Sequence, residues 1–252
     1  MIELKSNEEI ERMRRPSAIV AEILAALREA VRPGITTRDL DSLAERMIAR
    51  AGCRSAFKNY RVGNSVFPAV LCTSVNEEVV HGIPSDRELK EGDIVSLDFG
   101  VEADGFYGDA AITVPVGRID EESARLLEVT EKCLAAGIDQ LRAGNRLGDV
   151  GAAVQEIAEG AGFSVVRDFV GHGIGRALHE DPQVPNFGTR GRGRELRPGM
   201  VIALEPMINA GVAAVRVLDD GWTAVTADGK RSAHFEHTVA VTRNGPRILT
   251  AA

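Results

Sequence analysis

The sequence predicts an α+β fold built from two similar halves, each made of two helices, a strand and a hairpin. Three alignments indicate this duplication. Residues 87–98 align with 194–205, and residues 109–114 align with 236–241. Residues 33–39 match residues 143–149, and both segments lie between helical patterns. We expect a single domain over residues 1–252, with halves at about 6–118 and 119–252 that are close to two-fold symmetric.

Four segments carry apolar residues at mostly helical spacing, namely 6–27, 37–48, 121–141 and 147–161. Ser6 and Glu9 form a capping box at the start of the first helix. Proline lacks an N–H, so Pro16 is expected to kink or interrupt this helix. Thr37 is expected to cap the second helix, which Gly52 ends.

Apolar or alternating runs predict strands at 66–75, 94–99, 107–116, 201–204, 214–218, 222–226 and 235–242. A turn at residues 103–105 joins the second and third of these strands as a hairpin. Residues 76–84 are expected to form a loop that carries His81.

The composition is that of a soluble globular protein, with 44% apolar and 27% charged residues. No apolar run approaches the ~20 residues that span a bilayer, which argues against a membrane partner. The net charge of −7 argues against nucleic acid as a primary partner. The acidic and polar N-terminus does not resemble a secretory signal. Three widely spaced cysteines, Cys53, Cys72 and Cys133, indicate free thiols and a cytoplasmic location.

A glycine-rich stretch at residues 169–182 holds two histidines. Glycines bracket His172, and His179 follows seven residues later. Glycine permits close approach of the backbone to a ligand, and neutral imidazole binds metals or transfers protons. The alternative is a surface loop with two ordinary histidines. All five histidines of the chain lie in or beside motifs with a carboxylate or a glycine turn, which favours a functional site.

The duplication pairs Asp98 with Glu205 and Asp109 with Glu236, so four carboxylates should converge on the symmetry axis in the middle of a sheet. Buried like charges cannot all stay ionised without cations. Two divalent cations would balance the four charges, and His172 would add a nitrogen ligand. Such a mixed donor set suits Co²⁺, Mn²⁺, Fe²⁺ or Zn²⁺. The alternative, exposed carboxylates at strand ends, fits their apolar or glycine-rich settings less well.

Six motifs together resemble the type I methionine aminopeptidases: Val80-His81-Gly82-Ile83-Pro84, Asp98, Gly108-Asp109-Ala110, Gly171-His172-Gly173-Ile174-Gly175 with His179-Glu180, Glu205-Pro206-Met207 and Glu236-His237-Thr238. The resemblance extends from about Ser6 to Ile248. It implies a metallopeptidase domain of the pita-bread fold, in which helices cover a curved, mainly antiparallel sheet with a dimetal site at its centre.

The resemblance also implies the ligand set and the activity. Asp109 and Glu236 would bridge two metal ions, Asp98 would complete the shell of one, and His172 and Glu205 that of the other. The family removes the initiator methionine from nascent proteins when the second residue is small and uncharged. It does so through attack on the first peptide bond by a hydroxide that the two metals activate.

Three residues match the family's catalytic groups. Glu205 would shuttle a proton from the attacking water to the leaving amine. His179 would donate to the scissile carbonyl, and His81 would bind the substrate on the leaving-group side. The partner is expected to be the N-terminal methionine of nascent chains, with transient ribosome association by a monomeric enzyme.

The methionine pocket matches the family less closely. Its wall is expected to comprise Phe67, Cys72, Leu178 and Trp222. Asn64 stands where the family often has a tyrosine, Leu178 where an aromatic is common, and Gly100 where some members have a polar residue. Plain core packing is the alternative for Phe67, Leu178 and Trp222.

Two other functions are compatible with parts of this pattern. Proline-directed relatives with the same fold, aminopeptidase P and prolidase, carry an additional N-terminal domain, for which there is no room before Val66. A binding module that keeps the fold without catalysis would be expected to lose metal ligands, and all of them have matches here.

Overall fold

A computed structural model describes residues 2–251 as an α+β fold. The helices are α1 (Asn7–Ala30), α2 (Thr37–Ala51), α3 (Glu121–Gln140) and α4 (Leu147–Gly160). The strands are β1 (Arg54–Ser55), β2 (Arg61–Val62), β3 (Ser65–Val66), β4 (Cys72–Val75), β5 (Glu78–Val80), β6 (Ile94–Ala103), β7 (Phe106–Pro115), β8 (Ser164–Val165), β9 (Gly171–Gly173), β10 (Glu180–Val184), β11 (Val201–Leu204), β12 (Met207–Asn209), β13 (Val215–Val217), β14 (Ala224–Thr226), β15 (Ser232–His234), β16 (Glu236–Thr242) and β17 (Gly245–Ile248).

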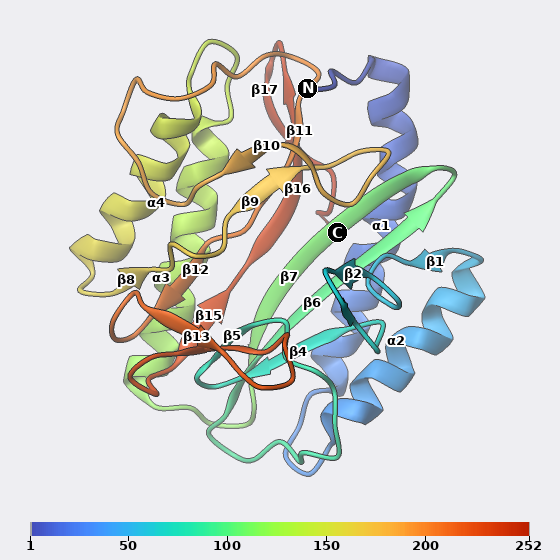
Figure 1. Cartoon of the computed structure of the whole chain (residues 1–252), viewed down its shortest axis with the longest axis vertical. Coiled ribbons are helices and arrows are strands. Elements are labelled where there is room, and N and C mark those ends of the chain that lie inside the picture. Colours follow the sequence, from blue (N-terminus) through green and yellow to red (C-terminus); the bar gives the residue numbers. More distant parts are fainter. Residues whose placement is uncertain (1, 252) are drawn as a thin grey trace.

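A nine-stranded antiparallel sheet forms the centre of the molecule (Figure 1). Its order is β1-β6-β7-β16-β11-β9-β10, with β4 paired to β6 and β17 paired to β16. Both helix pairs pack against one face of the sheet, α1–α2 over β6 and β7 and α3–α4 over β11 and β16 (Figure 1). This arrangement confirms the predicted α+β fold with helices covering a mainly antiparallel sheet.

Alternation along the long strands gives the sheet two different faces. Val95, Leu97 and Phe99 of β6 are buried in one apolar cluster with α1 and α2. Val239 and Val241 of β16 are buried in a second cluster with α3 and α4. Because successive side chains of a strand point to opposite faces, the residues between them project away from the helices. That second face is available for a site.

A matching hydrogen bond occurs in each of the two predicted halves. The Gly34 N–H donates to the Leu89 carbonyl at 2.8 Å, and the Gly144 N–H donates to the Leu196 carbonyl at 3.0 Å. In each half, this bond ties the turn between the two helices to the segment that leads into a central strand. The same local sequence therefore produces the same contact twice.

The predicted interruption of the first helix at Pro16 and the predicted cap at Thr37 are wrong, whereas a kink at Pro16 stays a prediction. Helix α1 continues through Pro16 without interruption, because this turn is buried against β7 and the Ser17 hydroxyl donates to the Met13 carbonyl at 2.8 Å. The N-cap of α2 is Thr36, which accepts the Asp39 N–H, whereas the Thr37 hydroxyl donates to the Ser85 carbonyl instead.

The strand predicted at 66–75 is confirmed only at its ends, in β3 and β4, because the chain leaves the ladder between them. The Asp41 carboxylate accepts the N–H groups of Val70 at 2.9 Å and Leu71 at 3.0 Å. These amides are therefore satisfied by a helix side chain rather than by a neighbouring strand. Strands β2 and β3 form a small hairpin that the sequence did not predict. Within residues 2–251, the helices are all too short or too polar to cross a membrane.

Candidate metal centre

Strand register brings three carboxylates together on the face of the sheet away from the helices. Asp98 on β6 lies opposite Ala111 on β7, and Ala111 lies opposite Glu236 on β16. Residues directly opposite in a ladder project to the same face. Asp109 is two residues from Ala111 and shares that face. The three carboxylates thus surround one small methyl group, which leaves room between them.

Strands β9 and β11 add the remaining two ligands. His172 on β9 lies opposite Ala203 on β11, and Ala203 lies opposite Thr238 on β16. Glu205 follows the end of β11, two residues beyond Ala203. His172 Nε2 lies 3.5 Å from Glu205 Oε1. The five predicted metal ligands therefore share one face of the sheet.

The donor atoms are positioned for a cation. Asp109, His172 and Glu236 each offer a ligand atom, and these atoms lie within 4.8 Å of one another. Among the described residues, Asp98 Oδ1, Asp109 Oδ1 and Glu236 Oε1 are buried without a hydrogen-bond partner. Buried polar atoms normally have partners, so these orphaned oxygens, with one imidazole nitrogen, fit a divalent metal.

The protein environment disfavours negative charge on these carboxyl groups. Burial raises the pKa of Asp98 to about 7. Burial also raises the pKa of Asp109, and the Asp98 charge adds to it. For Glu205 and Glu236, burial and then the neighbouring carboxylates raise the pKa well above the usual value. A cation bound among them would reverse this shift, because the ionised form then gains a partner.

Burial keeps the histidines of the site neutral. It lowers the pKa of His172 to about 3, with a contribution from His179, and the pKa of His81 to about 4. His172 Nδ1 lies 2.9 Å from the Gly173 carbonyl oxygen, an acceptor, so Nδ1 carries the proton. Its Nε2 is then the free lone pair, which is the form that binds a metal.

His179 contacts two rings of the site. Its Nδ1 lies 2.7 Å from the Tyr60 hydroxyl oxygen, and its ring centroid lies 4.3 Å from that of His172. Burial lowers the pKa of His179, so it is held as a neutral imidazole. The Tyr60 contact therefore decides which nitrogen of His179 faces the ligand cavity.

The carboxylates open onto a cavity of about 220 Å³. Its lining comprises Phe57, Tyr60, Val62, Phe67, Cys72, His81, Asp98, Asp109, His172, Leu178, His179, Glu205, Trp222 and Glu236. Every predicted ligand, catalytic residue and pocket residue is among them. Cys72 on β4 lies opposite Asp98 on β6, so its side chain projects to the same face of the sheet.

Sequence reasoning missed three lining residues, Phe57, Tyr60 and Val62. Asn64, which stands where the family often has a tyrosine, lies in the turn between β2 and β3. Tyr60, immediately before this hairpin, supplies the aromatic hydroxyl instead. The Gly63-Asn64 pair between short apolar runs was the available signal for the hairpin.

His81 stands on a short loop and is held in a left-handed conformation, with φ of 61°. Non-glycine residues adopt this conformation rarely and only when the surroundings impose it. Its ring makes T-shaped contacts with Phe169 at 5.4 Å and Trp222 at 6.2 Å. Gly82 fits tightly behind it, because a Cβ there would lie 2.2 Å from the Thr73 carbonyl oxygen.

The other two histidines occupy different places. His234 is buried, and its Nε2 lies 3.8 Å from Glu205 Oε2. His237 lies opposite Leu204 and so projects to the helix side, where its Nδ1 lies 2.9 Å from the Thr250 hydroxyl. Among the five histidines, His237 is therefore separated from the cavity by the sheet.

Comparisons with known proteins agree with this geometry. The model of metallopeptidase family M24 matches residues 11–243. A methionine aminopeptidase of Clostridium perfringens is 55% identical over 99% of both chains, and methionine aminopeptidase 1 of Bacillus subtilis is 48% identical over the same shares. The crystal structure of a methionine aminopeptidase from Thermotoga maritima has a TM-score of 0.96 at 48% identity, with full coverage of both chains.

The metal-free protein should lose stability as the pH rises. In the folded protein, the pKa of these carboxyl groups lies above the unfolded value of about 4. The stability that their protonated forms contribute is therefore fully present below about pH 4. This stability is lost as the pH rises through the folded pKa, about 7 for Asp98. The neutral histidines His172 and His81 oppose this loss below about pH 6.5, because burial lowers their folded pKa. We therefore expect the Tm in a chelator to fall between about pH 6.5 and pH 8. Calorimetry checks this.

Two comparisons sharpen the pH experiment. Protein saturated with a divalent cation should show a much smaller fall in Tm, and Asp98→Asn should reduce the fall in the chelated protein. A metal-free Tm that stays level or increases over this range contradicts the assignment of these carboxyl groups.

Proposed function

The chain belongs to metallopeptidase family M24 and, within it, to the methionine aminopeptidases, and on that premise we propose that it removes N-terminal methionine when the second residue is small and uncharged. One observation carries this proposal. Four carboxylates and His172 share one face of a sheet and open directly onto a small, largely apolar cavity. A peptide whose amino end enters this cavity would bring its first peptide bond to the ligand cluster.

As a metallopeptidase, the chain uses divalent metal. We infer two ions, of Co²⁺, Mn²⁺, Fe²⁺ or Zn²⁺, because two divalent charges balance four carboxylates. Asp109 and Glu236 would hold both ions, Asp98 one, and His172 with Glu205 the other. When bound, such ions lower the pKa of water and polarise the scissile carbonyl.

Glu205 is the group we assign to proton transfer. Its carboxylate lies between two neutral imidazoles, with Oε1 3.5 Å from His172 and Oε2 3.8 Å from His234. A carboxylate in this position can accept a proton and later release it. It would take a proton from the attacking water and deliver it to the leaving amine.

His179 and His81 are the groups we assign to the substrate. If the Tyr60 hydroxyl donates to His179 Nδ1, the His179 proton lies on Nε2. This N–H can then donate to the carbonyl oxygen as negative charge develops there. His81 is neutral and faces the cavity, so it can hydrogen-bond the peptide on the leaving-group side.

The cavity walls suit a methionine side chain. Phe67 and Trp222 are in T-shaped contact at 5.2 Å, and Cys72 and Leu178 complete apolar, polarizable surfaces. Sulfur makes favourable contacts with aromatic ring edges. Burying a methionine side chain contributes about 1.5–3 kcal/mol by transfer from water, which is enough to favour it over polar side chains.

We further propose that the chain acts as a monomeric, single-domain enzyme in the cytoplasm, on nascent chains and with transient ribosome association. The cytoplasmic location is supported by Cys53, Cys72 and Cys133, which are all free thiols.

A peptide panel tests the proposed activity. We expect cleavage of Met-Ala-Ser and Met-Gly-Met-Met, little cleavage of Met-Lys-Ser, and none of N-acetylated Met-Ala-Ser, because the free amine must reach the ligand cluster. Release of the first residue, ranked by kcat/KM at equal metal loading, is the measurement. Faster cleavage of Ala-Pro-Ala than of Met-Ala-Ser would overturn the specificity in favour of a proline-directed enzyme.

Two variants separate metal binding from catalysis. Asp109→Asn should lose bound metal, because a neutral amide is a poor bridging ligand. His179→Ala should keep its metal and lose about 10²–10³ in kcat, since a donor to the oxyanion is gone. Elemental analysis and kinetics of both variants check this. A metal-free His179→Ala would instead make His179 a ligand, and a fully loaded Asp109→Asn would remove Asp109 from the set.

Tyr60→Phe should lower kcat with little change in KM, because His179 loses the partner that fixes its tautomer. One neutral hydrogen bond contributes about 1 kcal/mol, so we expect roughly a fivefold decrease. Tyr107→Phe is the matched control, since Tyr107 is the other tyrosine of the chain and does not line the cavity. Equal kcat values for the two variants would contradict the role of Tyr60.

A further inference from the structure

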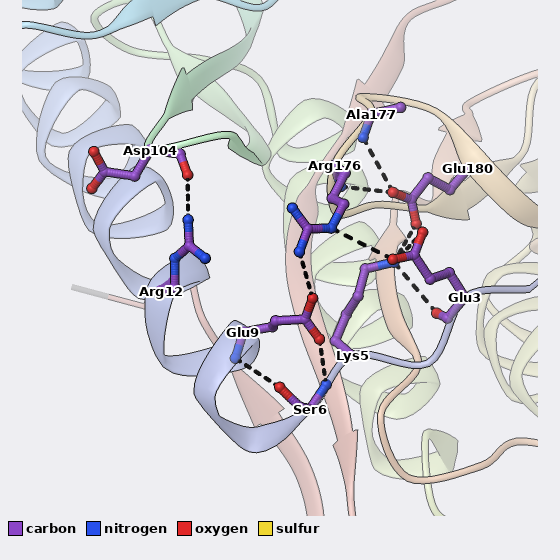
Figure 2. A network of polar contacts seen from close by, with 9 residues as sticks. All are labelled: Glu3, Lys5, Ser6, Glu9, Arg12, Asp104, Arg176, Ala177 and Glu180. Atoms are coloured by element: carbon purple, nitrogen blue, oxygen red, sulfur yellow. Dashed lines mark hydrogen bonds and ion pairs between the residues drawn. The ribbon is translucent and has the colours of Figure 1, made fainter.

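Lys5, in the segment before α1, is a buried lysine outside the proposed catalytic set. Its side chain is 1% exposed, and its Nζ lies 2.6 Å from Glu180 Oε2 (Figure 2). Lysine is almost never fully buried unless it is paired. Glu180 immediately follows His179 in the sequence, so this ion pair joins the N-terminal segment to the loop that carries His179 (residues 175–180).

Glu180 closes the loop that carries His179. Its Oε1 accepts the N–H of Arg176 at 2.7 Å and of Ala177 at 3.1 Å, while its Oε2 accepts Lys5 (Figure 2). The carboxylate therefore binds both the start of the loop and the N-terminal segment. Glu180 also begins β10, where it pairs with Gly173.

Lys5 is itself fixed to the sheet. Its backbone N–H donates to the Gly199 carbonyl at 2.7 Å, two residues before β11. Its side chain passes against Gly175, where a Cβ would lie 2.2 Å from Lys5 Cε. The ammonium thus reaches Glu180 from a rigid support, and a larger residue at position 175 would displace it.

A second, exposed set of ion pairs surrounds this buried pair. Arg176 lies 2.7 Å from Glu9 Oε1 and 3.6 Å from Glu3 Oε1, and its side chain is 51% exposed (Figure 2). Water screens such pairs, so they contribute little to order. The buried pair has no such screening, and it is the contact that should decide the conformation of the loop.

We infer that Lys5 is a positioning residue for the reaction, which holds His179 in place through the buried ion pair with Glu180. This inference rests on the proposed function, because His179 is assigned there to the scissile carbonyl. The consequence is that removing the ammonium should loosen residues 175–180 and slow turnover while the metal ligands stay in place. Binding of the methionine side chain should change less, because Leu178 is the one proposed pocket wall on this loop, whereas Phe67, Cys72 and Trp222 stand on other segments.

Lys5→Met tests the inference, because methionine fills similar space without the charge. On Met-Ala-Ser, we expect kcat to fall by about 10–100-fold, KM to change by less than about threefold, and metal content to stay unchanged. Hydrogen–deuterium exchange of the metal-free protein should become about tenfold faster at residues 175–180 and not in the central strands. Glu180→Gln keeps an acceptor for the two loop amides, and should show the same changes to a smaller extent. It also serves if Lys5→Met does not fold.

The matched control is Glu9→Gln, which removes the exposed ion pair with Arg176 but keeps the capping box of α1. Its kcat should stay within about twofold of wild type. The role of Lys5 is overturned if the wild type is active and both Lys5→Met and Glu180→Gln keep its kcat and its hydrogen–deuterium exchange rates. Faster exchange spread evenly over the chain, with loss of metal, also overturns it in favour of a purely structural role. Absence of wild-type cleavage contradicts the proposed function instead, while the exchange data still decide whether Lys5 orders the loop.

Discussion

Four carboxylates on one face of a β-sheet, with Asp109 and Glu236 buried and Asp98 and Glu205 half-buried, are the constraint on which the rest of the structure depends. An ionised carboxylate away from water is very costly unless it is paired, and here burial raises the pKa of all four groups. The cluster is therefore stable either when it holds protons or when it holds cations. Only the strand ladder keeps the groups together against their repulsion, so the sheet must be rigid before the site can exist.

The sheet obtains this rigidity from its other face. The residues that alternate with Asp98 on β6, such as Leu97 and Phe99, are fully buried against α1 and α2. The same strand therefore contributes to the core and to the ligand set, and neither can move without the other. Strand β7 approaches α1 closely at Gly108, since a Cβ there would lie 2.7 Å from the Ser17 N of α1. The ligand positions are set by core packing rather than by flexible loops.

Local pattern made part of this site predictable from the sequence. The duplication and the period-two alternation of strands indicated that Asp98 and Glu205, and Asp109 and Glu236, would converge, and both signals can be read directly from the sequence. Tyr60 was missed because its partner His179 is 119 residues away and no periodicity links them. The strand predicted at 66–75 is broken in its middle for a similar reason: the backbone amides that Asp41 accepts belong to a segment remote in sequence.

His81 and His179 lie on loops, so contacts outside the strand ladder must hold them in place. His81 is fixed by a left-handed backbone between aromatic rings, and His179 by Tyr60 on one side and the Lys5–Glu180 pair on the other. A pair of apolar residues in place of a buried ion pair often stabilises a fold equally well, but it could not accept the two amide hydrogens of the loop. The buried pair at Glu180 therefore contributes conformational precision more than stability, and it does so beside His179, the residue that we assign to the scissile carbonyl.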